Sequence, residues 1–241
     1  MERRLRLIRI ASPKREAENH RLTLKNAERR VALEVYETAV DGSQPRLEVL
    51  AFEQFVSDFD EENVIQSTKI GSCIGIIFNR KHALNNSFNI TTQNHGFQMR
   101  TFVQCVYDES GKLLPSLVEP ARNPVNEPRP ADAGSAAANR ELIGEHSFIL
   151  VERIAVSTAH RRQGIGSQML RSMLTDALET LPHVGFAVSW PCASDVDCAD
   201  MGFPPGARVP AGRGQQRAED FHHAMGFRRL GLTRFWAKAL R

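Results

Sequence analysis

The sequence has few cysteines, and their arrangement does not point to a metal site. There are four in 241 residues, and none forms the Cys-x-x-Cys spacing typical of zinc and redox sites. Cys192 and Cys198 could reach a shared metal ion, but no histidine pair lies near them at zinc-finger spacing. We therefore expect no bound metal and free thiols in a reducing compartment, the cytoplasm or alternatively the nucleus.

Long apolar runs and blocks of like charge are also missing. No apolar stretch approaches the roughly 20 residues of a transmembrane helix, so we expect a soluble protein without a membrane partner. The formal net charge of +3 is small and no cluster of Lys and Arg stands out, which argues against a nucleic-acid partner. The basic start could serve as a targeting segment, but Glu2 and Glu16 oppose this, and the alternation over residues 4–7 favours a first β-strand.

The first 113 residues contain no motif that we can match to a function. Apolar spacing predicts a helix over residues 16–39, although Val31–Val35 could instead be a strand. Apolar residues between 52 and 59 fit one face of a second helix. Ile70–Phe78 and Phe97–Tyr107 are typical of strands, and turn residues follow the second of them.

The segment 114–139 is rich in proline and poor in apolar residues. Such a composition cannot bury enough apolar surface to order itself. The segment separates two predicted strands of one sheet. We therefore expect a mobile insertion within a single domain that spans residues 1–241.

The segment from Ser147 to Ser167 carries the strongest functional signal. A strand pattern over residues 147–156 leads into a turn with two arginines and two glycines, and an amphipathic helix pattern follows over residues 165–181. Gly164 and Gly166 have no Cβ atom, so a ligand can approach the backbone closely. Free N–H groups at a helix N-terminus favour an anion. The pattern predicts a pyrophosphate site.

The residues of this turn distinguish between known kinds of pyrophosphate site. A P-loop requires a lysine after its last glycine, and a dinucleotide fingerprint requires a third glycine where Met169 stands. The turn resembles instead the acetyl-CoA signature of the GNAT N-acetyltransferases, Arg/Gln-x-x-Gly-x-Gly/Ala, with Val156 at the family's valine position. Phe221–Phe227 is similar to the family's C-terminal motif, so the resemblance covers about residues 145–240. The alternative is an ordinary glycine-containing turn with solvated arginines.

The resemblance implies both a fold and an activity. The fold would be α/β, with a mixed central sheet, flanking helices and a splay between two parallel strands, here residues 147–156 and 184–190. The activity would be direct transfer of an acetyl group from acetyl-CoA to a primary amine of a small molecule, a peptide N-terminus or a lysine. The acceptor's identity and the oligomeric state stay open. The alternative function is a non-catalytic acyl-CoA-binding sensor or adaptor.

The resemblance also implies the residues that hold the co-substrate. Backbone groups of Ile154, Ala155 and Val156 would bind the pantetheine arm, with the Val156 N–H as the donor to the oxyanion. The pyrophosphate would lie on the turn and the start of the helix, namely Arg161, Arg162, Gln163, Gly164, Ile165, Gly166 and Ser167.

Glu152 is the candidate for the general base that deprotonates the amine. Strand alternation places it on the same face as Leu150, Ile154 and Val156, two steps from the presumed reaction centre. A charge paired with a neighbouring arginine is the alternative, and Glu145 or His146 could share or take the role of base.

His222 is the candidate for the acid that protonates the departing thiolate. The family often has a tyrosine at this place, whereas this chain has only Tyr36 and Tyr107. A half-buried helix residue without a chemical role is the alternative. Three aspartates make the loop over residues 191–214 locally acidic, which would attract a cationic acceptor unless they are simply solvated.

Overall fold

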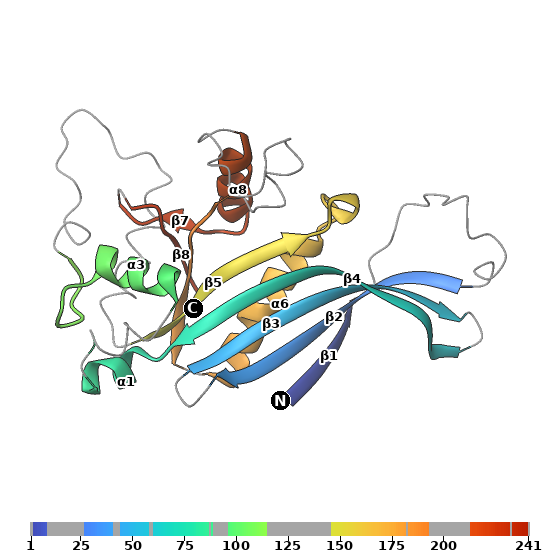
Figure 1. Cartoon of the computed structure of the whole chain (residues 1–241), viewed down its shortest axis with the longest axis horizontal. Coiled ribbons are helices and arrows are strands. Elements are labelled where there is room, and N and C mark those ends of the chain that lie inside the picture. The colour runs from blue at the N-terminus through green and yellow to red at the C-terminus, as the bar shows by residue number, and fades with distance from the viewer. Residues whose placement is uncertain are drawn as a thin grey trace. The chain divides into compact units, whose positions relative to one another are not determined.

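The computed structural model describes residues 2–8, 27–40, 44–57, 60–86, 88, 96–114, 146–181, 183–192, 213–231 and 233–240. They form an α/β protein with helices and a mixed, partly parallel sheet (Figure 1). The chain divides into two compact units. The first comprises Met1–Gly75 and Arg153–Thr175, and the second comprises Ile76–Glu152 and Asp176–Arg241. The single domain expected over residues 1–241 stays a prediction.

The first unit contains a set of long antiparallel strands. These are β1 (Glu2–Ile8), β2 (Ala27–Val40), β3 (Gln44–Ser57) and most of β4 (Asp60–Phe78). β1 pairs with β2, and β2 pairs with β3 along its whole length; the three lie side by side in Figure 1. Alternate residues Leu47, Val49 and Ala51 of β3 are buried, whereas the residues between them are half-buried. One face of this sheet therefore forms a core.

The two helices predicted in this region are wrong. Residues 27–39 belong to β2 and residues 52–57 to β3, while residues 16–26 and Phe59 lie outside the described part of the chain. The alternative strand at Val31–Val35 is confirmed, as is the first strand over residues 4–7. The pairing of β2 with β3 gives long stretches of backbone hydrogen-bond partners, and this tertiary pairing outweighed a short run of helical spacing.

β4 confirms the strand predicted over Ile70–Phe78, and Gly71 is a point of close packing within it. A Cβ atom on Gly71 would lie 3.0 Å from the backbone oxygen of Ala155 and 3.0 Å from Met169 Cε. Ala155 belongs to β5 (Ser147–Val156) and Met169 to α6 (Ile165–Thr180). The absence of a side chain therefore lets β4 approach the segments that carry the predicted co-substrate site.

We predict that Gly71→Val lowers the free energy of unfolding by about 1–3 kcal/mol, because the new side chain overpacks the interior. Chemical denaturation monitored by far-UV circular dichroism measures this. Thr68→Val in the same strand is the control, since Thr68 is exposed and the new side chain is β-branched like the old one. Equal stability of the two variants would contradict the close approach at Gly71.

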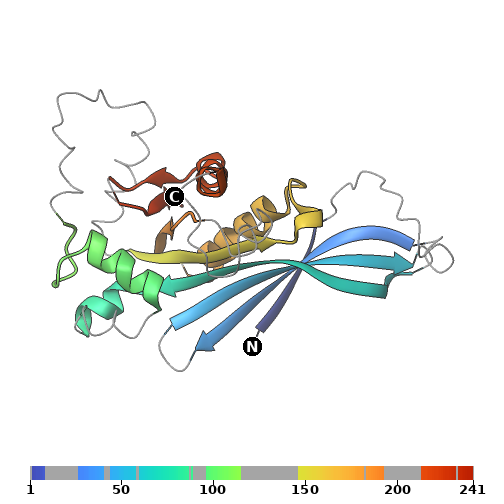
Figure 2. The same ribbon diagram turned by 45° about the horizontal axis from the view of Figure 1, so that its top comes forward.

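The second unit combines parallel and antiparallel strands. β5 runs parallel to β6 (Val184–Ser189), which pairs antiparallel with β8 (Trp236–Ala239), and β8 pairs with β7 (Arg228–Arg229). α8 (Arg213–Ala224) lies beside β7 and β8, as Figure 1 and Figure 2 show. The predicted strands at 147–156 and 184–190 and the helix at 165–181 are confirmed to within one residue.

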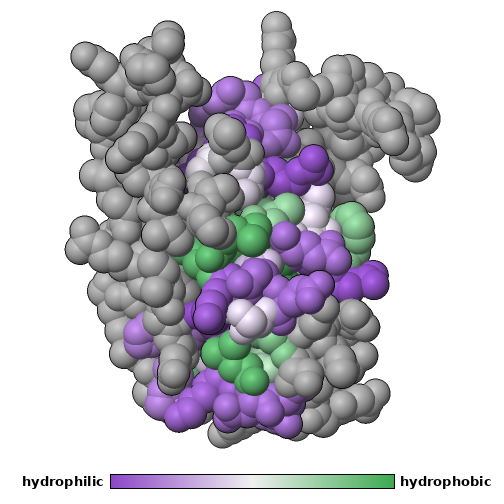
Figure 3. Space-filling model, turned by 90° about the vertical axis from the view of Figure 1, so that its left-hand side faces the viewer, coloured by the Kyte–Doolittle hydropathy of each residue, from purple (hydrophilic) through white to green (hydrophobic). Residues whose placement is uncertain are grey.

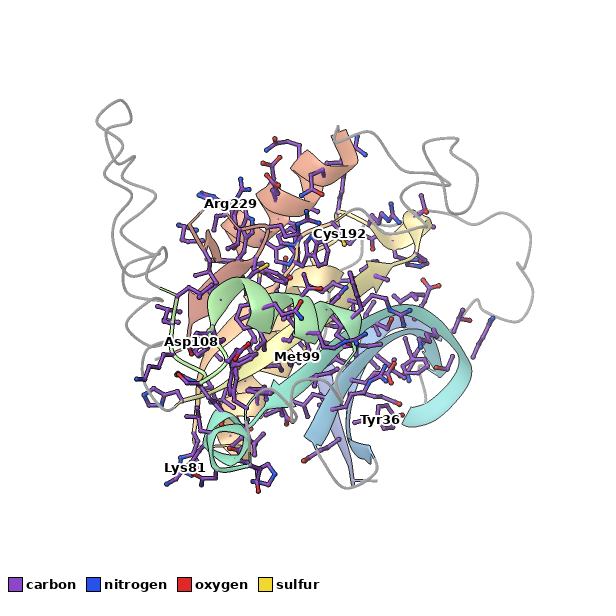
Figure 4. All side chains as sticks on the ribbon, turned by 60° about the vertical axis from the view of Figure 1, so that its left-hand side comes forward. Tyr36, Lys81, Met99, Asp108, Cys192 and Arg229 are labelled. Atoms are coloured by element: carbon purple, nitrogen blue, oxygen red, sulfur yellow. The ribbon has the colours of Figure 1, made fainter. Side chains whose placement is uncertain are left out.

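Two helices, α1 (Arg80–Asn85) and α3 (Phe97–Val106), complete the second unit. The strand predicted over Phe97–Tyr107 is wrong, because α3 buries residues at helical spacing, among them Met99, Phe102 and Val106 (Figure 4). The Phe102 ring lies 5.1 Å from that of Phe148 in β5. α3 thus covers one face of β5.

The turn predicted after α3 is confirmed. Asp108 Oδ1 accepts hydrogen bonds from the backbone N–H groups of Ser110 and Lys112, at 2.9 Å each. The Ser110 hydroxyl also donates to Asp108 Oδ1, at 2.7 Å. This hydroxyl bond first, and then the backbone bonds, lower the pKa of the exposed Asp108 carboxyl. The turn ends at Gly111, whose carbonyl accepts from the buried Arg80 side chain at 2.7 Å.

Among the residues that are coloured in Figure 3, hydrophilic ones predominate, with patches of apolar residues between them. Among the helices that the structure describes, none has both the length and the apolar character needed to cross a membrane.

The predicted insertion at 114–139 lies outside the described residues except for Leu114. Glu145 and the three aspartates of the acidic loop also lie outside them.

Candidate functional site

The predicted pyrophosphate turn connects β5 to α6. It lies within the first unit and includes one turn of 3-10 helix, η2 (Thr158–His160). Two of the predicted ligand side chains hold this connection together. Arg161 Nε donates to the Val156 carbonyl at 3.0 Å, and Gln163 Nε2 donates to the Ala159 carbonyl at 3.3 Å. Their contacts with the backbone fix the path of the turn, so they shape the site from within.

Two left-handed residues in the turn direct the backbone into α6. Gly164 has φ +80° and Arg162 has φ +62°, which costs a residue with a side chain about 1–2 kcal/mol. A Cβ atom on Gly164 would meet no heavy atom within 4 Å. The space over this glycine is therefore open, and the exposed Arg162 is held in a strained conformation beside it.

The start of α6 presents backbone donors that the helix itself leaves unpaired. The first helical hydrogen bond runs from the Gln168 N–H to the Gly164 carbonyl at 3.0 Å. The N–H groups of Ile165, Gly166 and Ser167 precede that bond, so the helix itself offers them no acceptor. The positive end of the helix dipole lies at the same point. The structure thus brings the predicted residues Gly164–Ser167 together as one cluster of donors.

β5 is longer than its pairing with β6. The parallel register runs to Val151↔Ser189, where β6 ends, and β5 continues through five more residues to Val156. Among the described residues, no strand pairs with this last part of β5 on the edge that pairs with β6 earlier in the strand. The predicted splay requires such an unpaired stretch.

The orientation of the backbone along this stretch follows from one hydrogen bond. The Ser157 N–H donates to the Ile70 carbonyl of β4 at 2.8 Å. Because successive strand residues direct their N–H and C=O groups to opposite sides, Ala155 also faces β4, as its oxygen near Gly71 indicates. Ile154 and Val156 face the unpaired side. Of the three residues predicted to hold the pantetheine arm, Ile154 and Val156 have the suitable orientation, whereas the Ala155 backbone groups face β4.

Glu152 lies at the N-terminus of α3 in the second unit. Its Oε1 atom is 3.6 Å from the position that a Cβ atom on Gly96 would occupy, and Gly96 is the N-cap of α3. Gly96 offers no side-chain cap, and the positive end of a helix dipole favours an anion. The Glu152 carboxylate therefore lies near the positive end of the α3 dipole.

His222 is buried, and both of its ring nitrogens have partners. Nδ1 lies 2.8 Å from the Ala218 carbonyl oxygen, and Nε2 lies 2.7 Å from Ser189 Oγ. Since a carbonyl only accepts, Nδ1 carries the proton, and Nε2 of the neutral ring accepts from the Ser189 hydroxyl. Burial lowers the pKa of His222 below its ordinary value, and the bond to Ala218 opposes this only in part. The neutral ring has no proton on Nε2 to donate.

The two predicted catalytic residues lie on opposite faces of the second unit's strands. Leu150 and Val188 belong to the core beneath α3, and alternation places Glu152 on that same face. Ser189 follows Val188 and so points to the other face, where it meets His222 of α8. Sequence reasoning missed Ser189, although a polar residue at the end of an apolar strand was a usable signal.

We predict that stability falls as the pH drops below about 6.5, the ordinary pKa of histidine. In that range His222 binds a proton in the unfolded chain but not in the folded protein, where burial disfavours the charged ring. The loss of stability therefore continues until the pH reaches the lowered pKa of His222 in the folded protein. Urea denaturation of His222→Gln between pH 7.5 and 5 should show a smaller loss than the unchanged protein.

His223→Gln is the matched control, because the neighbouring His223 side chain is exposed. It should retain the full pH dependence. The same slope in His222→Gln and in the unchanged protein would show that burial of this ring does not couple stability to pH.

No group of three or more His, Cys, Asp or Glu residues in the described ranges is placed to hold a metal ion. Comparisons with protein-family models, with curated proteins and with solved structures find no match for this chain.

Proposed function

We propose that this chain is an acetyl-CoA-dependent N-acetyltransferase of the GNAT type, which transfers an acetyl group to a primary amine. The observation that carries the proposal is the unpaired end of β5, which leads directly into a glycine turn at a helix N-terminus. Donors on the strand suit an extended amide-containing arm, and donors on the helix suit a diphosphate. CoA contains both groups, in that order from its thiol.

In this proposal the turn and the strand divide the co-substrate between them. The N–H groups of Ile165, Gly166 and Ser167 bind the pyrophosphate, with Gly164 leaving room and Arg162 adding positive charge. Arg161 and Gln163 hold the turn in shape through their backbone contacts. Ile154 and Val156 bind the pantetheine arm, which is extended and carries amide groups.

The chemistry requires a neutral amine and a donor for the oxyanion. At neutral pH only on the order of one alkylamine molecule in a thousand is uncharged, and a carboxylate that removes the proton contributes about 10²–10⁴-fold. Glu152 takes this role in our proposal. The Val156 N–H, two positions along from Ile154 on the unpaired side, donates to the oxyanion, a contact worth about 3–4 kcal/mol in the transition state.

The departing thiolate needs a proton or must leave as the anion. His222 stays the predicted donor, but it could act only as the imidazolium, because the neutral ring accepts from Ser189. This arrangement favours a second candidate function, an acyl-CoA-binding sensor without turnover. Calorimetric binding of acetyl-CoA combined with no release of free CoA across an amine panel would support the sensor.

We predict that Gly164→Glu weakens acetyl-CoA binding at least about a hundredfold, because it adds a like charge beside the diphosphate. Isothermal titration calorimetry measures this, and far-UV circular dichroism should show helicity unchanged. Gly164→Asn is the control, since asparagine tolerates the left-handed backbone that φ +80° requires. Gly164→Asn should bind acetyl-CoA nearly as well as the unchanged protein. Normal binding by Gly164→Glu would contradict a pyrophosphate site at this turn.

We predict that Glu152→Gln lowers kcat by about 10²–10⁴-fold at pH 7 and regains part of the loss as the pH rises and more amine is neutral. Release of free CoA, followed from pH 6.5 to 9.5, measures this. Glu109→Gln, in the exposed turn after α3, is the control and should match the unchanged protein. If the ratio of kcat for the variant to kcat for the unchanged protein stays constant with pH, Glu152 is excluded as the base.

A further inference from the structure

Two aromatic rings form a platform beside Glu152 in the second unit. Phe97, the first residue of α3, is 67% exposed, and its ring lies 6.3 Å from that of Trp190 at an interplanar angle of 37°. Trp190 directly follows the end of β6. The Trp190 ring also packs edge-on against the buried Phe235 ring, with the two centroids 5.5 Å apart, and this contact fixes its position. We call Phe97 and Trp190 the aromatic pair.

A guanidinium group contacts the Trp190 ring of this pair. Arg234 Cζ is 5.0 Å from the centroid of the Trp190 ring, and its side chain is exposed. The turn that carries it is closed by hydrogen bonds from Leu230 N–H to the Phe235 carbonyl, at 2.9 Å, and from Thr233 N–H to the Leu230 carbonyl, at 3.0 Å. Arg234 is therefore presented from a fixed backbone.

The Glu152 carboxylate lies close to the start of α3. It approaches Gly96, which is the neighbour of Phe97 in the chain. Successive contacts within the second unit thus link Glu152, by way of Gly96, to the aromatic pair and to Arg234, and we call these residues the row. For Arg234, no carboxylate partner is found in the described parts of the chain, so its charge is available to a ligand.

Each part of the row selects a chemical group. The carboxylate attracts an ammonium group, the rings favour a flat apolar segment, and a guanidinium binds a carboxylate or phosphate with strong, charge-assisted hydrogen bonds. We propose that the acceptor is a primary amine joined through a flat apolar segment to an anionic group, with its amine at Glu152 and its anion at Arg234. This assignment rests on the proposed acetyltransferase function.

Three probes separate the contribution of the anion from that of the amine. para-Aminomethylbenzoate carries both charges, its methyl ester lacks the anion but keeps the shape, and benzylamine lacks the group altogether. With acetyl-CoA and the full-length protein, release of free CoA gives kcat/KM for each. We expect the acid to exceed the ester by about tenfold or more, since hydrogen bonds to charged groups contribute about 1.5–3 kcal/mol.

Arg234→Gln tests the assigned residue. The ratio of kcat/KM for the acid to that for the ester should fall towards one in this variant and should be partly kept in Arg234→Lys, which retains the charge. Arg217→Gln is the matched control, because Arg217 is an exposed arginine of α8, and it should keep the ratio of the unchanged protein. A thermal melt of each variant confirms that the fold is kept.

The outcomes separate the two proposals. If the unchanged protein acetylates acid and ester equally well, or if Arg234→Gln keeps the preference for the acid, the acceptor assignment is overturned while the acetyltransferase function stands. If none of these probes, nor any member of a broad amine panel, releases free CoA, the proposed function is overturned and the acceptor assignment with it.

Discussion

The end of the parallel pairing at Val151 and Ser189 is the constraint on which the rest depends. A strand that continues beyond its partner presents backbone groups that need hydrogen-bond partners. In β5 the hydrogen bond from Ser157 to β4 decides which of these groups face the unpaired side, and they are those of Ile154 and Val156. The same strand carries Glu152 just before them and enters the glycine turn just after them. One strand therefore orders the proposed base, the donors for the co-substrate and the anion site along the chain.

The two faces of the second unit differ in chemistry. The face covered by α3 carries Glu152, the aromatic pair and the exposed Arg234, so that face combines a carboxylate, two rings and a guanidinium. The opposite face carries Ser189 and His222, a buried pair in which both ring nitrogens of the histidine already have partners. This division makes the α3 face the side from which we expect the amine to approach. It gives His222 a clear part in holding α8 against β6, whatever its part in the chemistry.

How well each element can be predicted from the sequence depends on whether its signal is local in the chain. β5, α6 and β6 were predicted to within one residue, because an apolar strand, a glycine turn and an amphipathic helix follow each other with clear boundaries. The apolar residues of α3 are dense enough to fit the period of a strand as well as that of a helix, and its packing on Phe148 decides between them. β2 and β3 stabilise each other by pairing, which no local spacing reveals. The proton position on His222 and the row from Glu152 to Arg234 arise from contacts between distant segments, so the sequence contains no direct sign of them.

The most direct test of the central claim is to follow individual backbone amides while acetyl-CoA is added. Hydrogen exchange resolved by residue, together with amide chemical shifts, reports on Ile154, Val156 and the first turn of α6 separately. Our account predicts that these amides shift and become protected when acetyl-CoA binds, while that of Ala155, which faces β4, changes little. Binding that leaves Val156 and Gly166 unchanged while other amides respond would contradict the account.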